Sequence, residues 1–319
     1  MILTFIDIAT DGSVKRSSLE ALTYGSKLAS QLGMQAHGVI LSNTTEDLSS
    51  LGKYGVQQIH QVTHDHLKHF DAQLFASVIA QVAEKINASV IIFSNNTDGK
   101  AMAPRLSVRL KAGLVSGAVA LPETTDGFVV KKSVFSGKAF AHVKITSAVK
   151  IISVNPNAFA IEASVGSAEV VPFDATVEPP KVIVKEIKKE SGEVPLAEAE
   201  IVVSGGRGLK GPENWGILED LAKVLNAALA CSRPVADAHW RPHQEHVGQT
   251  GGAIAPNLYI ACGISGAIQH LAGVNRSKTI VVVNKDPEAP FFKAADYGVV
   301  GDLFEVIPKL TQEIKKIKG

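Results

Sequence analysis

The chain has 319 residues and a formal net charge of +1, with 45% hydrophobic and 20% charged residues. This length predicts about two domains, and the composition is that of a globular protein rather than a disordered one. The near-zero charge, the aromatic content of 6% and the lack of a basic stripe with interleaved aromatic residues argue against nucleic-acid binding.

The N-terminal residues predict neither a signal peptide nor a membrane anchor. Residues 1–8 run directly into an apolar strand that lacks a charged leader and cleavage site and is too short to cross a bilayer. We therefore expect a cytoplasmic bacterial protein. Cys231, after a helix-like run, and Cys262, at a strand end, are expected to be reduced and packed.

The first half of the chain alternates strand and helix patterns. Strands are predicted at residues 2–8, 36–41, 90–93 and 113–120, and helices at residues 17–32, 71–86 and 100–111. Ser17 or Ser18 is expected to cap the first helix, and Gly33 to end it. This rhythm predicts a parallel sheet with helices on both faces. Further strand patterns, expected to be antiparallel additions to that sheet, lie at residues 128–135, 139–146 and 150–154.

A change in composition separates the two halves. Residues 165–197 contain several prolines and the charged run 185–190, and residues 182–187 alternate in polarity, as a pairing strand does. Ser191, Gly192 and Pro195 predict a flexible joint. The predicted domains are therefore residues 1–190 and residues 191–319.

The rhythm restarts in the second domain. Strands are predicted at residues 201–203, 258–261, 279–284 and 297–300, helices at residues 215–229 and 302–317, and a short strand or turn at residues 234–237. The result is a second, smaller, doubly wound α/β domain. Its ligand site is expected above the carboxyl ends of the strands, where the strand order reverses.

Three glycine-containing runs belong to this second domain: SGGRGLK at 204–210, VGQTG at 247–251 and GISGAIQHLAG at 263–273. Glycine allows positive φ and close approach of the backbone to a ligand. Ser265 is expected to cap a helix at residues 266–272, whose free amides would face an anion. The spacing matches neither G-x-G-x-x-G nor the P-loop, so alone it indicates an anion or cofactor site, or ordinary tight turns.

The order of these runs is far more specific than any one of them. Together with ACSR at 230–233, IVVVNKDPEAP at 280–290, DYG at 296–298 and DL at 302–303, they closely resemble the alpha subunits of electron transfer flavoproteins. The resemblance is dense from about residue 201 to the end and looser over residues 1–180. It implies two Rossmann-like domains: the first would contact a beta subunit, and the second would bind one non-covalent FAD.

The resemblance also implies which residues bind the FAD. Hydroxyl, amide and cationic groups would hold the phosphates: Arg207, Ser232, Ser265 and Gly266. Polar groups at strand and helix ends would hold the adenosine end: Asn284, Asp302 and Leu303. Groups around the flavin ring would be Arg233, His270, Thr250, Gln249 and Gln269. The remaining members of the implied site are Val247, Gly248, Ala267 and Ile268.

The implied function is electron transfer without substrate chemistry, so the chain is expected not to be an enzyme. Arg233 and His270 would stabilise the negative charge of a half-reduced flavin, which lets electrons pass one at a time. The donors would be flavin dehydrogenases, such as acyl-CoA dehydrogenases of fatty acid β-oxidation, and the acceptor a membrane quinone oxidoreductase. The beta subunit would carry AMP. Without the surrounding runs, a lone helical histidine is more commonly structural. Asp237 and Glu213 are interpreted as turn or capping groups.

Other interpretations stay open. A bifurcating, NADH-dependent relative would hold a second FAD in place of AMP. A stand-alone flavin- or NAD-dependent dehydrogenase, or a nucleotide-binding module without redox activity, is the alternative from another class. Residues 239–243, and Gly252 with Ala253 where a lysine is common in the family, depart from its usual pattern near the expected flavin entrance.

Two histidine groups invite a metal interpretation, at positions 60, 64, 66 and 69 and at positions 239, 243 and 246. No cysteine lies near them and no H-E-x-x-H pattern occurs, so we expect solvated polar surface.

Overall fold

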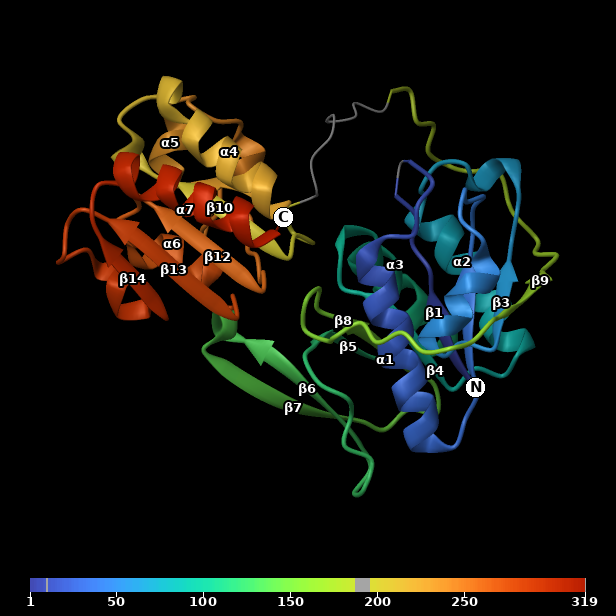
Figure 1. The fold of residues 1–319 in the computed structure, drawn as a ribbon. Helices are drawn as coiled ribbons and strands as arrows, with labels where there is room; N and C mark the ends of the chain where they lie inside the picture. Colours follow the sequence, from blue (N-terminus) through green and yellow to red (C-terminus); the bar gives the residue numbers. More distant parts are fainter. Residues whose placement is uncertain (10, 187–195, 319) are drawn as a thin grey trace. The chain divides into compact units, whose positions relative to one another are not determined.

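The computed structural model describes residues 1–9, 11–186 and 196–318. The chain divides into a first unit, Met1–Lys189, and a second unit, Glu190–Gly319 (Figure 1). Each unit is an α/β fold with its own sheet. Residues 190–195 of the predicted joint lie outside the described residues. The strand predicted at residues 182–187 is wrong over its described part, because residues 182–186 form no strand.

The first unit is built on a nine-stranded sheet in the order β7-β6-β5-β8-β4-β1-β2-β3-β9. Its strands are β1 (Ile2–Phe5), β2 (Ala36–Ile40), β3 (Gln58–Gln61), β4 (Val90–Ser94), β5 (Gly113–Ala118), β6 (Phe128–Val134), β7 (Ala139–Ile145), β8 (Lys150–Val154) and β9 (Glu169–Pro172). Its helices are α1 (Arg16–Leu32), α2 (Ala72–Lys85) and α3 (Thr97–Leu110).

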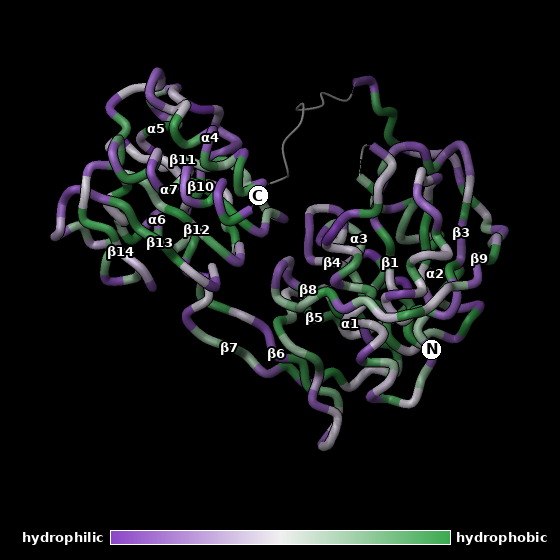
Figure 2. The backbone as a smooth tube through the Cα atoms, in the orientation of Figure 1, coloured by the Kyte–Doolittle hydropathy of each residue, from purple (hydrophilic) through white to green (hydrophobic). Residues whose placement is uncertain are grey.

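Helices cover both faces of this sheet, as the alternating pattern predicts. Leu22, Tyr24 and Leu28 of α1 pack in one apolar cluster, with alternate residues of β1, β2 and β4. Residues of α2 and α3, such as Ile79 and Met102, pack in a second cluster against the other face. Figure 2 shows the hydrophobic segments concentrated inside each unit.

The first unit differs from the sequence predictions in three respects. The strand β8 is parallel to both of its neighbours, β4 and β5. The antiparallel pairs among the described strands are β5 with β6 and β6 with β7. The helix α1 begins at Arg16 with Lys15 at the cap position; the hydroxyl of Ser18 instead accepts a hydrogen bond from the Asp7 amide. The strand β3 and the edge strand β9 have no counterpart among the predicted elements.

The second unit has a five-stranded parallel sheet in the order β11-β10-β12-β13-β14. Its strands are β10 (Ile201–Gly205), β11 (Ala228–Cys231), β12 (Leu258–Cys262), β13 (Thr279–Asn284) and β14 (Tyr297–Val300). Its helices are α4 (Gly216–Leu225), α5 (Arg233–Asp237), α6 (Ile268–Val274) and α7 (Leu303–Lys318).

The helix predicted at residues 215–229 is shorter than expected. Asn226 takes a left-handed conformation and ends α4, and the chain then forms β11. Cys231 therefore ends a strand rather than a helix-like run, and residues 234–237 belong to a helix, α5. Both cysteines are buried thiols, and burial raises their pKa values to about 12.

Two apolar clusters cover the two faces of the second sheet. One contains residues of α4, α5 and α7, including Leu218, Val235 and Ile307. The other contains Tyr259 of β12, Val274 of α6 and Phe291. No helix among the described residues is both long and apolar enough to cross a membrane.

Candidate functional site

The strand order of the second sheet reverses between β10 and β12, because the chain passes from β10 outward to β11 and then returns to β12. The loops that leave these two strands bond to each other. The Gly206 amide donates to the Cys262 carbonyl at 2.9 Å, and the Gly208 amide to the Gly263 carbonyl at 3.1 Å. A Cβ on Gly208 would lie 2.6 Å from the Gly263 Cα, so this contact requires glycine.

A pocket of about 450 Å³ opens at the carboxyl ends of β10, β11 and β12. Such a position at a strand-order reversal is where ligands bind in open α/β sheets. The pocket is lined by Arg207, Ser232, Arg233, Pro234, His246, Val247, Gly248, Gln249, Thr250, Gly263, Ile264, Ser265, Ala267, Gln269 and His270.

Most of the sequence-predicted site residues are brought together in this pocket. The predicted residues that do not line it are Gly266, Ile268, Asn284, Asp302 and Leu303. The pocket residues that the prediction missed are Pro234, His246, Gly263 and Ile264. Gly263 and Ile264 open the third glycine-containing run, so treating each run as continuous finds two of these four. His246 directly precedes the second run and is found only if that run is extended by one residue.

The first turn of α6 differs from the expected one. The helix begins at Ile268 with Ala267 at its cap position, so Ser265 does not cap it. Gly266 has φ of +79°, and a Cβ there would lie 2.4 Å from the Phe291 Cβ. The exposed Ser265 accepts a hydrogen bond from the Phe291 amide through its carbonyl at 3.0 Å. The turn at Gly266 therefore moves the start of the helix to Ile268, and the Ser265 side chain lines the pocket.

The run from Val247 to Gly251 forms a wall of the pocket because both of its sides are anchored. The Val247 amide donates to the Cys231 carbonyl at 3.0 Å, which continues the edge of β11. The Gln249 amide donates to the Gln269 carbonyl of α6 at 2.7 Å. Gly248 makes this crossing possible with φ of +152°. The wall is thus fixed between a strand and a helix.

The segment that leads into this wall is held by Arg241. Its guanidinium donates to both carboxylate oxygens of Glu245, at 2.8 and 2.7 Å, and to Glu219 of α4 at 2.7 Å. It also lies over the Trp215 ring, 5.0 Å from the centroid. The pair of Arg241 with Glu245 is mostly buried, and the pair of Arg241 with Glu219 ties the segment before His246 to α4.

One cationic side chain that lines the pocket, Arg233, is exposed. The Arg233 side chain is 64% exposed and makes an ion pair of 3.3 Å with Asp237, one helical turn away. Asp237 is thus the partner of Arg233 rather than a capping group. Exposed pairs of this kind contribute little to stability, so an anionic ligand could recruit Arg233 at little cost. Arg207, at the end of β10, is also exposed.

His270 differs from these arginines because it is buried. Its Nε2 lies 2.8 Å from the hydroxyl of Tyr259, which is fully buried. Among the described residues, its Nδ1 has no hydrogen-bond partner. Burial lowers the pKa of His270 to about 4; His246 adds to this effect, and the nearby Val247 backbone opposes it. The imidazole is therefore neutral at pH 7.

These features suit a ligand that carries both phosphate and carbonyl groups. The exposed cations and loop amides match phosphate oxygens. A buried nitrogen without a partner costs free energy, which a ligand that hydrogen-bonds to it removes. The residues present therefore fit a flavin dinucleotide.

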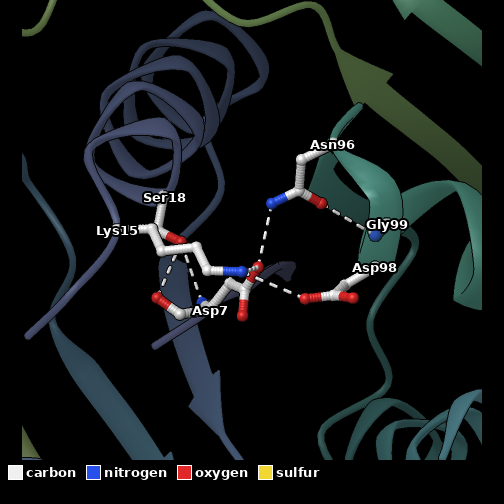
Figure 3. A network of polar contacts seen from close by, with 6 residues as sticks. All are labelled: Asp7, Lys15, Ser18, Asn96, Asp98 and Gly99. Carbon is white, nitrogen blue, oxygen red and sulfur yellow. Dashed lines mark hydrogen bonds and ion pairs between the residues drawn. The ribbon is translucent and has the colours of Figure 1, made fainter. Parts of the chain in front are cut away.

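The equivalent position in the first unit is filled by charged side chains. There the strand order reverses between β1 and β4, and Figure 3 shows the network beyond their carboxyl ends. Lys15 pairs with Asp7 at 2.7 Å and with Asp98 at 3.0 Å, and Asn96 donates to Asp7 at 2.8 Å. Burial raises the pKa of Asp7 to about 6, against the opposing effect of Lys15.

The histidine groups give no metal site. No cluster of three or more possible protein ligands occurs in the part of the chain that the structure describes. The expectation of solvated surface is wrong for two members, however. His60 is buried on β3, where it lies 3.0 Å from Nδ1 of His37, and His246 is buried in the pocket wall.

Comparison with known proteins gives consistent matches along the chain. The family described as "Electron transfer flavoprotein domain" matches residues 2–178, and "Electron transfer flavoprotein FAD-binding domain" matches residues 195–275. The chain is 38% identical over 313 residues to the "Electron transfer flavoprotein subunit alpha" of Bacillus subtilis, covering 96% of this chain and 95% of the relative.

Two further relatives extend this similarity. The protein of the same name from Thermoanaerobacterium thermosaccharolyticum is 37% identical over 316 residues, covering 97% and 96% of the two chains. The "Probable electron transfer flavoprotein subunit alpha, mitochondrial" of Cryptococcus neoformans is 38% identical over 316 residues, covering 96% and 90%.

Proposed function

This chain belongs to the electron transfer flavoproteins as an alpha subunit, and from that premise we propose that its second unit binds one FAD non-covalently in the pocket above β10, β11 and β12. The observation that carries the proposal is the composition of this pocket: two exposed arginines and a buried, incompletely bonded histidine within one set of glycine-built loops.

Each part of the pocket has a task in this proposal. Arg207 and the amides after β10 and β12 would bind the phosphates, together with Ser232 and Ser265. Arg233 and His270 would lie against the flavin ring, with Thr250 and the two glutamines as hydrogen-bonding groups around it. When bound, FAD supplies a ring that takes up and releases electrons singly. Arg233 would favour its reduced form by positive charge.

The adenosine end is proposed to lie beyond the pocket lining. Asn284 donates from Nδ2 to the Ile264 carbonyl at 3.0 Å, so it already shapes the pocket wall. Asp302 accepts from the Phe304 amide at 2.9 Å at the start of α7. Leu303 packs close to Gly263, where a Cβ would lie 2.9 Å from the leucine Cδ2. These residues therefore adjoin the loops that form the pocket.

We propose that the chain carries electrons and does not transform a substrate. Among the described residues that line the pocket, none is an aspartate or glutamate, the usual carboxylate bases of a dehydrogenase. Flavin dehydrogenases, including acyl-CoA dehydrogenases, would be the donors, and a membrane quinone oxidoreductase the acceptor. The proposed setting is the bacterial cytoplasm, in a heterodimer with a beta subunit that holds AMP.

Co-expression with the beta subunit, followed by a count of FAD and AMP per heterodimer, tests this proposal. We expect one FAD and one AMP. Two FAD molecules without AMP would replace the carrier proposal with the bifurcating one. Substrate turnover by the alpha chain alone would support a stand-alone dehydrogenase. A colourless heterodimer that cannot be reloaded with FAD would contradict flavin binding itself.

A further inference from the structure

The pair formed by Tyr259 and His270 connects the interior of the second sheet to the pocket. Tyr259 is fully buried on β12, and its hydroxyl oxygen lies 2.8 Å from Nε2 of His270 on α6. The two rings also pack with Phe291, which stands edge-on to the imidazole at 5.7 Å. Neither side chain can rotate away without disrupting this packing, so the hydrogen bond has a fixed geometry.

Both partners are neutral, which leaves two possible directions for the bond. Burial lowers the pKa of His270 and raises that of Tyr259. Either the phenol donates to Nε2, with the imidazole proton on Nδ1, or Nε2–H donates to the phenol oxygen. In the second case the phenol proton would need another acceptor in the same buried site.

The environment of the phenol favours the first direction. Among the described residues, the one hydrogen-bond partner of the phenol is Nε2 of His270, and the buried Ser204 hydroxyl has no hydrogen-bond partner. The phenol proton therefore has no other acceptor in this buried site and is donated to Nε2 of His270. The imidazole proton then lies on Nδ1, the nitrogen that has no partner among the described residues.

We propose that Tyr259 is a positioning residue that fixes His270 in its Nδ1–H tautomer, so that the ring offers a hydrogen-bond donor, rather than an acceptor, to a carbonyl oxygen of the bound cofactor. This inference rests on the proposed function. A neutral N–H donor in a fixed orientation favours ligands that place a hydrogen-bond acceptor, such as a flavin carbonyl, opposite it, and disfavours ligands that place a donor there. Without Tyr259 the tautomer would be set by the ligand alone.

The tautomer can be read without flavin chemistry. The alpha chain, labelled with ¹⁵N-histidine, would be assembled with unlabelled beta subunit and examined without FAD at pH 7 by long-range ¹H–¹⁵N correlation. His270→Gln identifies the His270 signals. We expect protonation at Nδ1 in the wild type and a shift of the proton towards Nε2 in Tyr259→Phe. Protonation at Nε2 in the wild type overturns the inference.

Two variants control for packing and for bond direction. Tyr24→Phe removes an equally buried hydroxyl, which donates to the Ala120 carbonyl at 3.0 Å in the first unit, and should leave the His270 signals unchanged. Ser204→Ala should also leave the tautomer at Nδ1–H. A change of tautomer in Ser204→Ala would show that the phenol donates to Ser204, and would overturn the inference even if Tyr259→Phe does not fold.

FAD titration of the heterodimer separates this inference from the proposed function. Loss of the fixed donor should weaken FAD binding about five- to tenfold in Tyr259→Phe, as expected for one hydrogen bond, and leave it unchanged in Tyr24→Phe. Equal affinity in Tyr259→Phe and the wild type counts against Tyr259 alone. A wild type that binds no FAD contradicts the proposed function, whereas the tautomer measurement still decides the direction of the bond.

Discussion

Burial shifts the pKa values of two side chains, one in each unit, in opposite directions. It favours the neutral form of both, which raises the pKa of Asp7 to about 6 and lowers that of His270 to about 4. Between these values the folded first unit holds a proton that the unfolded chain has released. The folded second unit lacks a proton that the unfolded chain has bound. The two shifts therefore give opposite dependences of stability on pH.

As the pH falls from about 6 to 4, we expect Asp7 to add to the stability of the first unit and His270 to subtract from that of the second, each on the order of 2–3 kcal/mol. Denaturant titrations of the flavin-free protein measure this. Fluorescence of Trp215 and Trp240 reports the second unit, and hydrogen exchange reports the first. Asp7→Asn should remove the pH dependence of the stability of the first unit, and His270→Gln that of the second. If the pH dependence of a unit persists in the matching variant, another titratable group causes it.

Arg233 offers a test of electrostatics with little effect on folding. We expect Arg233→Ala to bind FAD but to give a lower yield of the one-electron-reduced flavin, because a positive charge near the ring is lost. Stability should change by less than about 0.5 kcal/mol, since the side chain is exposed. Redox titration measures the yield. Lys210→Ala, which removes a cation outside the pocket lining, is the control; an equal yield in wild type and Arg233→Ala would remove Arg233 from this role.

Turns, rather than strands, determine where the elements of the second unit begin and end. Gly266 is the clearest case, because its positive φ and its contact with Phe291 set the start of α6. Gly216, at the start of α4, has no atom within 4 Å of the place a Cβ would occupy. The two glycines thus have opposite tolerance for a methyl group.

We expect Gly266→Ala to destabilise the second unit by about 2–4 kcal/mol and to weaken FAD binding, because the Cβ overlaps Phe291 and the backbone conformation is strained. Gly216→Ala should stabilise it by about 0.5–1 kcal/mol, since alanine restricts the unfolded chain at a helical position. Thermal unfolding followed by tryptophan fluorescence compares them. Similar melting temperatures for the two variants would be inconsistent with a close-packed turn at Gly266.

The ion pairs of Arg241 tie the pocket wall to α4, so their loss should loosen that wall. We expect Arg241→Ala to cost about 3–5 kcal/mol, because it removes the guanidinium that neutralises the mostly buried Glu245 carboxylate. Lys316→Ala breaks an exposed pair with Glu313 and should cost less than about 1 kcal/mol. Urea unfolding measures both. If the two variants had the same free energy of unfolding, Glu245 would have to be solvated or bound by another group in Arg241→Ala.

The elements that the sequence predicts correctly are those with strong periodicity or continuous apolar runs. Exposure alternates along β7, as it does in an edge strand with one solvated face. The alternation of polar and apolar residues that causes this can be read from the sequence. By contrast, β8 is a short apolar run, and its parallel direction depends on strands far away in the chain. The strands β3 and β9 are both short, and β9 ends in Pro172, so local propensity gives little signal for either.

The site was predictable to a similar degree. The order of the glycine runs predicts most of the residues that the pocket brings together, because two of those runs follow β10 and β12 and the other is bonded between β11 and α6. The contribution of Tyr259 could not be predicted, since the residue lies within an apolar strand and its hydroxyl meets His270 only through packing. The pairing of Arg241 with Glu219 is likewise set by tertiary structure.

At the scale of the whole molecule, the two units have separate apolar cores, and the proposed ligand touches only one of them. We therefore expect two unfolding transitions in calorimetry of the flavin-free alpha chain. FAD at 100 times its Kd should stabilise the transition of the second unit by about 2.7 kcal/mol and leave the other in place. An equal shift of both transitions would show that the units unfold together.

The charged network beyond β1 and β4 has a consequence for anyone who wishes to engineer a cofactor into the first unit. Replacing Lys15 alone to enlarge that corner would leave the Asp7 and Asp98 carboxylates without their shared cation. An incoming phosphate would then meet negative charge, whereas we propose that the phosphates in the second unit meet arginine. A successful design would have to replace the two carboxylates with neutral or cationic side chains before a cavity is opened there.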